Sequence, residues 1–218
     1  MREQTAFVYR LRQIVRSRTK TRRNKAYLNV LDATTIKKAK AELRNTIKSR
    51  IAAVPVQQLI TAGSCAALLL PSIPGWERFR SVLLFSSMKD EIDTSPLIET
   101  IINAKKTVFI PQIEGEDMVF YQAGHTCPGD GKNALALKPA DFPALVITPG
   151  LAFDRNMIRL GRGRSFYDRF FTSLDAAHRD YTALGLCMDC QLADKIPADI
   201  WDKKMDMLLT ESGLILPF

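Results

Sequence analysis

Short runs of apolar residues, many of them β-branched, alternate with helical stretches along most of the chain, and this alternation limits the possible folds most strongly. Strand and helix in succession predict a mainly parallel sheet with helices on both faces, a three-layer α/β fold. In such folds ligands bind at the carboxyl ends of the strands. We expect Pro111 to end the strand over 107–110. The runs suited to buried strands are 81–85, 107–110, 119–121, 144–148, 181–186 and 207–210, and helices are expected over 56–70, over 94–105 and after Phe166.

An amphipathic helix is expected ahead of these elements. Apolar residues recur in steps of three and four from Ile36 to Ile51, after the potential N-caps Thr34 and Thr35 and before Pro55. The polar face of this helix is rich in lysine and arginine, which also suits an ordinary solvated surface. We place one α/β domain over 34–218 and a basic extension over 1–33.

Residues 1–30 carry the whole net charge of +8, because they hold nine basic side chains and one acidic one, and the other 188 residues hold 22 of each sign. Three interpretations stay open. An arginine-rich, acid-poor start is typical of mitochondrial targeting, with a cytoplasmic location as the alternative. The segment also suits an arm that binds RNA in a ribonucleoprotein, or a solvated extension.

Other features exclude some classes of protein. No apolar run approaches the roughly twenty residues of a membrane-spanning helix, so membrane insertion is not expected. The four cysteines are scattered, and the Cys187–Cys190 pair has no second pair at zinc-ribbon spacing, so we expect thiols without a metal or redox role. Segment 122–143, with its glycines and prolines, predicts a long surface loop.

The most informative stretch follows the strand that ends near Thr148. Glycines let backbone N–H groups approach an anion, arginines supply compensating charge, and a following helix adds the positive end of its dipole. A strand, this loop and a helix in succession predict a phosphate-binding site. The loop residues are Arg159, Gly161, Arg162, Gly163 and Arg164.

Three segments together resemble the 5-formyltetrahydrofolate cyclo-ligases, also called methenyltetrahydrofolate synthetases. They are the basic helix segment 40–44, the segment 87–94 and the phosphate loop 149–168. The resemblance spans nearly all of 35–212. It implies an ATP- and magnesium-dependent ligase of folate metabolism, in which the formyl oxygen is phosphorylated, the neighbouring amine closes the ring and phosphate leaves.

The resemblance also implies a role for particular residues. Arg162 and Arg164 would act in catalysis, Glu91 and Phe166 would contact the folate, and Asp168 and Asp202 would hold Mg²⁺. The residues expected to contact ATP are Lys40, Arg44, Arg159, Gly161, Arg162, Gly163, Arg164, Ser165 and Tyr167.

The chain departs from the family pattern inside the loop. Met157 and Ser165 replace glycines, Phe166 replaces a tyrosine, and segment 122–143 is shorter than expected. If residue 165 has a positive φ, its serine is strained by roughly 1 to 2 kcal/mol. These departures keep a second hypothesis open, in which a catalytically impaired cyclo-ligase fold serves a mitochondrial ribonucleoprotein such as the mitoribosome, anchored on RNA by residues 1–30.

Overall fold

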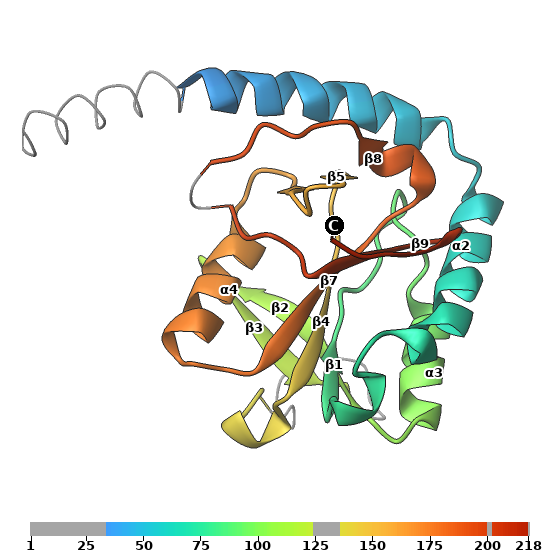
Figure 1. Cartoon of the computed structure of the whole chain (residues 1–218), viewed down its shortest axis with the longest axis vertical. Helices are drawn as coiled ribbons and strands as arrows, with labels where there is room; N and C mark the ends of the chain where they lie inside the picture. Colours follow the sequence, from blue (N-terminus) through green and yellow to red (C-terminus); the bar gives the residue numbers. More distant parts are fainter. Residues whose placement is uncertain (1–33, 124–135, 200–201, 218) are drawn as a thin grey trace, which may run out of the picture. The chain divides into compact units, whose positions relative to one another are not determined.

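The computed structural model describes residues 34–123, 136–199 and 202–217 (Figure 1). The basic extension 1–33 lies outside these residues, as does most of the predicted loop 122–143. The chain divides into two units, 1–41 and 42–218, and only 34–41 of the first is described. The expected domain boundary at 33/34 stays a prediction.

A seven-stranded sheet forms the centre of the second unit, in the order β10-β9-β7-β4-β1-β2-β3. The five inner strands pair in parallel, and the edge strands β3 and β10 pair antiparallel. The predicted mainly parallel α/β fold is therefore confirmed. The strands are β1 Ser81–Leu83, β2 Thr107–Glu114, β3 Asp117–Gln122, β4 Ala144–Thr148, β7 Tyr181–Leu186, β9 Met207–Thr210 and β10 Gly213–Ile215.

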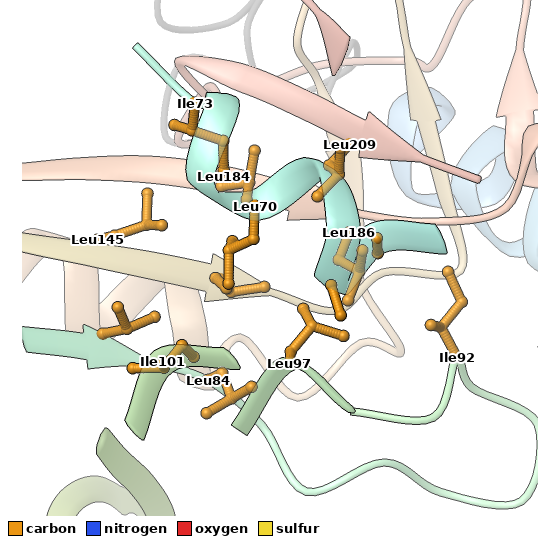
Figure 2. Packing of buried hydrophobic residues seen from close by; sticks show 14 of the residues in the cluster. Leu70, Ile73, Leu84, Ile92, Leu97, Ile101, Leu145, Leu184, Leu186 and Leu209 are labelled. Atoms are coloured by element: carbon orange, nitrogen blue, oxygen red, sulfur yellow. The ribbon is translucent and has the colours of Figure 1, made fainter. Parts of the chain in front are cut away.

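Helices cover both faces of this sheet (Figure 1). Alternate residues of one strand point to opposite faces, so in β4 Leu145 and Ile147 join one core cluster, whereas Ala144 and Val146 join the other. The first cluster lies under α2, Val56–Leu69, and α3, Ser95–Asn103 (Figure 2). The second lies under α4, Phe166–Ala176.

The expectation that Pro111 closes the second strand is wrong. β2 continues to Glu114 and forms a hairpin with β3, in which Pro111 pairs with Phe120. Proline is tolerated where no ladder bond needs its missing N–H. Phe109 is the last residue of β2 paired with β1, so the missing N–H of Pro111 breaks no bond to that neighbour.

A second, three-stranded sheet was not expected from the sequence. It contains β5 Ala152–Asp154, β6 Arg159–Leu160 and β8 Leu192–Ala193, in the order β6-β5-β8. The predicted first helix is present as Thr34–Ala52. Ile47 and Ile51 of this helix pack with Leu160 and other residues of the second sheet and its loops. The phosphate loop therefore has a core of its own.

Among the described residues, no single helix is long and apolar enough to cross a membrane, although the bent pair Thr34–Ala52 and Val56–Ser72 passes that test by length and composition together.

Candidate functional site

The site lies where the chain path of the sheet reverses. From β1 the chain passes through α3 to β2 on one side, whereas β4, on the other side of β1, leads through α4 to β7. The loops that leave β1 and β4 thus diverge at their carboxyl ends, which is the common place for a ligand in an open α/β sheet. These loops are residues 84–94 and 149–165.

Arg159 is the most deeply buried cation of the phosphate loop. Its side chain is 6% exposed, and one guanidinium nitrogen, Nη2, donates to Asp168 Oδ1 at 2.8 Å. Nη1 lies 3.4 Å from the carbonyl oxygen of Pro149, and the guanidinium stands 5.4 Å from the ring centre of Tyr167. Asp168 lies in the first turn of α4, where the helix dipole favours a negative charge. The arginine is held in place by its neighbours on several sides.

Two buried polar atoms in this cluster have no hydrogen-bond partner among the described residues: Nε of Arg159 and the hydroxyl of Tyr167. A buried donor without a partner costs roughly 1 to 3 kcal/mol of stability. Two unpartnered donors in one cluster are therefore rare away from functional sites. Burial raises the pKa of Tyr167 far above its ordinary value, Arg159 opposes this rise, and Glu91 adds to it. The tyrosine is a neutral donor at any physiological pH. Unpaired donors fit an anionic guest such as phosphate.

Glycines let the loop fold closely around arginine side chains. A Cβ on Gly161 would lie 2.9 Å from Nη1 of Arg159, and Gly163 has a φ of +102°. Arg44 Nε donates to the carbonyl oxygen of Gly161 at 2.9 Å, and its guanidinium lies within van der Waals distance of the same position on Gly163. Arg44 and the loop are thus brought together. Lys40 belongs to the first unit, so its contact with ATP stays a prediction.

Arg162 joins the phosphate loop to the loop after β1. Its Nη2 donates to Asp90 Oδ1 at 2.8 Å and to Glu91 Oε1 at 3.1 Å. The Glu91 side chain is 8% exposed, and its Oε2 accepts from the N–H of Met88 at 3.0 Å. Partial burial by itself would lower the pKa of Arg162, but the two carboxylates outweigh it and raise that pKa. The residue expected at the phosphate and the residue expected at the folate are therefore in direct contact.

Met157 and Ser165 both adopt the left-handed conformation, with φ of 65° and 54°. These are the two positions at which the resemblance leads us to expect glycine, and a residue with a Cβ is strained there. Met157 is buried, and its N–H donates to the carbonyl oxygen of Asp154 at 2.9 Å. Ser165 is exposed and caps α4 without a side-chain hydrogen bond. Both replacements therefore stand at backbone conformations that favour glycine.

Arg169 of α4 closes the far end of the loop. Its guanidinium donates to the carbonyl oxygens of Arg164 at 3.1 Å and of Glu116 at 2.5 Å, and it lies 5.1 Å from the ring centre of Phe166. Glu116 lies in the β2–β3 turn, so Arg169 anchors the loop to that hairpin. The Arg164 side chain itself is exposed.

The predicted magnesium ligands engage local partners. Oδ1 of Asp168 lies 2.8 Å from Nη2 of Arg159, beside the phosphate loop. Oδ2 of Asp202 accepts from the N–H of Asp199 at 2.6 Å. Within residues 34–123, 136–199 and 202–217, no group of three or more His, Cys, Asp or Glu side chains is arranged to hold a metal. Oxygen donors of this kind suit Mg²⁺ when phosphate oxygens and water complete its shell. The pairing of Asp168 with Asp202 stays a prediction.

Sequence reasoning missed two residues that hold the loop in place. The buried carboxylate of Asp154 accepts from the N–H groups of Asn156, Ile158 and Ile196 at 2.8 to 3.0 Å. Gln191 Nε2 donates to the carbonyl oxygens of Gly150 and Leu151. Asp154 lies within the loop segment 149–168, and an aspartate two residues before a turn residue is a weak signal for such an Asx bond. Gln191 gave no signal.

Known proteins resemble this chain over most of its length. Residues 36–211 match the model of the 5-formyltetrahydrofolate cyclo-ligase family. The 5-formyltetrahydrofolate cyclo-ligase of Escherichia coli K12 is 30% identical over 181 residues, which cover 76% of this chain and 97% of the relative. The cyclo-ligase of Mus musculus is 28% identical over 83% of this chain and 98% of the relative.

Solved structures agree with the sequence matches. The NMR structure of 5,10-methenyltetrahydrofolate synthetase from Aquifex aeolicus has a TM-score of 0.68 and 26% identity, and the match covers 81% of this chain and 92% of that one. The Mycoplasma pneumoniae synthetase, with a TM-score of 0.65 and 19% identity over 79% of this chain and 98% of that one, shares the fold. The sequence match, the fold and the position of the phosphate loop lead to one conclusion: the chain belongs to the 5-formyltetrahydrofolate cyclo-ligase family.

Proposed function

We propose that this chain converts 5-formyltetrahydrofolate to 5,10-methenyltetrahydrofolate at the expense of ATP. The match over residues 36–211 and relatives named for this activity support the proposal. The observation that carries it is the contact between Arg162 and Glu91, which joins the phosphate loop to the loop expected to bind folate. A reaction between ATP and folate needs these two subsites side by side.

In the proposed reaction the formyl oxygen attacks the γ-phosphorus and ADP leaves. The neighbouring amine nitrogen then bonds to the formyl carbon and loses its proton, and the carbon–oxygen bond breaks to release phosphate. Both steps move negative charge within the loop, where fixed cations stabilise it most effectively. Arg159, Arg162 and Arg164 provide these cations, and Glu91 orients the folate.

Magnesium is part of the proposal, with Asp168 and Asp202 as its ligands. Bound there, the ion would neutralise charge on the phosphate oxygens. The chain's own contribution is to hold Asp168 at the start of α4 through Arg159.

The direct test is to incubate the full chain with 5-formyltetrahydrofolate and magnesium ATP and to follow the absorbance of methenyltetrahydrofolate. We expect product that depends on ATP and forms much more slowly, at a still measurable rate, in the variant Arg162→Ala. Arg155→Ala is the matched control, because Arg155 is an exposed arginine of the same loop. Absence of product from the correctly folded wild type would eliminate the proposed activity.

A mitochondrial location is the finer proposal for the extension 1–33. Its arginine-rich composition supports this, and a relative from Arabidopsis thaliana, 25% identical over 210 residues, is named as mitochondrial. Residues 1–33 fused to a fluorescent protein should direct it to mitochondria, and a diffuse cytoplasmic signal would favour the alternative.

RNA binding by residues 1–30 is the other prediction for the extension, and the comparisons lend it no support. It predicts an RNA affinity that falls steeply with salt in the full chain and not in a chain that begins at Thr34. Equal affinities and equal salt dependence would exclude the arm.

A further inference from the structure

Asp90 makes the shorter of the two contacts to Arg162, and neither the sequence pattern nor the proposed reaction gives it a role. Both carboxylates bond the same nitrogen, Nη2, with Asp90 Oδ1 at 2.8 Å and Glu91 Oε1 at 3.1 Å. One guanidinium nitrogen thus has two acidic partners from adjacent residues. A single partner would suffice to neutralise the cation.

The two carboxylates differ in their surroundings. The Glu91 side chain is 8% exposed, and Met88 binds its second oxygen through a backbone N–H, whereas the Asp90 side chain is 43% exposed. A buried carboxylate without a hydrogen-bonding partner is costly. Glu91 therefore needs Arg162 until a substrate supplies other donors, whereas water can solvate Asp90.

This difference defines what happens when folate arrives. Donor groups of a bound folate that engage Glu91 would compete with Nη2 of Arg162 for the same carboxylate. Without a second anchor, the guanidinium would then be free to swing away from the loop at the stage when the phosphoryl group moves. Asp90 is this second anchor, because its Oδ1 lies 2.8 Å from Nη2 of Arg162.

We propose that Asp90 is a positioning residue that holds Arg162 in place while Glu91 is engaged by the folate. The inference rests on the proposed function, because it assigns Arg162 to the phosphoryl group and Glu91 to the folate. It predicts that Asp90 affects turnover through Arg162 and leaves folate binding nearly unchanged.

The kinetic test compares full-length wild type with Asp90→Ala, Arg162→Ala and the double variant. We expect Asp90→Ala to lower kcat about tenfold while the KM for folate changes less than about twofold, because Arg162 acts on the phosphoryl group and not on the folate. The double variant should be no slower than Arg162→Ala. Independent, multiplied losses in the double variant would overturn the proposal, as would a change confined to the KM for folate.

Two further variants separate positioning from general damage to the loop. Asp90→Glu keeps a carboxylate that can reach Arg162 and should recover most of the lost kcat. Asp93→Asn is the control, because Asp93 bonds Ser95 at the start of α3. If Asp93→Asn reproduces the loss of kcat seen with Asp90→Ala, the role of Asp90 is merely structural.

A binding experiment keeps the inference testable even if the wild type has no turnover, the result that would refute the proposed function. With a non-hydrolysable ATP analogue, magnesium and 5-formyltetrahydrofolate present, Asp90→Ala should raise the dissociation constant of the analogue at least threefold. In the Arg162→Ala background the same change should have no effect. An equal effect in both backgrounds would show that Asp90 does not act through Arg162.

Discussion

The two ends of α4 each pair an aspartate with a cation, but they do so in different ways. At the first turn, Asp168 bonds Arg159, whose side chain is 6% exposed and whose Nε has no partner among the described residues. At the last turn, Asp175 bonds Lys203 and Tyr181, and the aspartate and lysine side chains are 52% and 34% exposed. A buried cation with a spare donor is suited to a ligand, whereas an exposed, mutually bonded cluster contributes only to stability.

Asp168→Asn should produce the largest effect at the first end. The neutral side chain loses the ion pair that holds Arg159, so we expect turnover to fall about 100-fold, the scale of losing one electrostatic contact in a transition state. The free energy of unfolding should fall by only about 1 to 2 kcal/mol, because Asp168 is a third exposed and water weakens its ion pair with Arg159. Methenyltetrahydrofolate absorbance and urea unfolding measure the two. Unchanged turnover would show that the buried pair at the first turn of α4 has no more functional importance than the exposed pair at its last turn.

Arg159→Lys tests the unpaired donor. Lysine keeps the charge but loses Nε and the planar fork, so affinity for an ATP analogue should fall about tenfold. Titration calorimetry measures it. Arg155→Lys, in the exposed turn of the same loop, should bind as the wild type does. If both variants bind alike, the spare donor of Arg159 has no ligand.

Ser165→Gly tests the strain at the start of α4. Glycine accepts a φ of 54° without a clash, and relief of about 1 to 2 kcal/mol, less the greater freedom of glycine in the unfolded chain, leaves a gain of about 0.5 to 1 kcal/mol. Ser165→Ala keeps the Cβ and should gain nothing. Thermal unfolding of the three proteins decides, and equal stability of the two variants would show that the serine is not strained.

Asp175→Asn should produce the smallest effect, at the second end. The exposed pair contributes about 0.5 kcal/mol or less, and turnover should not change. Burial would raise the pKa of Asp175, but the hydrogen bonds from Tyr181 and Lys203 lower it below its ordinary value of 3.8.

A depressed carboxylate pKa stabilises the fold above the unfolded-state pKa, and this stabilisation is lost as the pH falls through the folded-state pKa. Tyr181, whose pKa rises to about 12, mainly by burial, stays protonated throughout this range. Urea unfolding of wild type and Asp175→Asn should therefore differ at neutral pH and converge below pH 3.8. A difference that grows in acid would contradict this.

The long buried strands were predictable from sequence. The runs 144–148, 181–186 and 207–210 coincide with β4, β7 and β9, because strands buried on both faces are apolar throughout. β5, β6 and β8 are two or three residues long, too short to show a period, and no pattern in the sequence indicated them.

The site divides in the same way. The phosphate loop could be predicted because its glycines and arginines are adjacent in the chain. The bonds of Asp90 to Arg162, of Asp154 to Ile196 and of Gln191 to Gly150 could not, since they join groups 72, 42 and 41 positions apart. Hydrogen bonds over such separations leave no local periodicity.

By itself, the sequence determined the parallel α/β core and the chemical character of the loop, because burial and backbone geometry act on neighbouring residues. Only the tertiary structure decided that Arg162 lies against Asp90 and Glu91 and that Arg159 is buried with an unpaired donor. The first arrangement depends on β1 and β4 lying side by side in the sheet. Strand order is set by the packing of the whole chain, and partners such as Ser81 and Ala144, which are far apart in the sequence, meet only when that packing is complete.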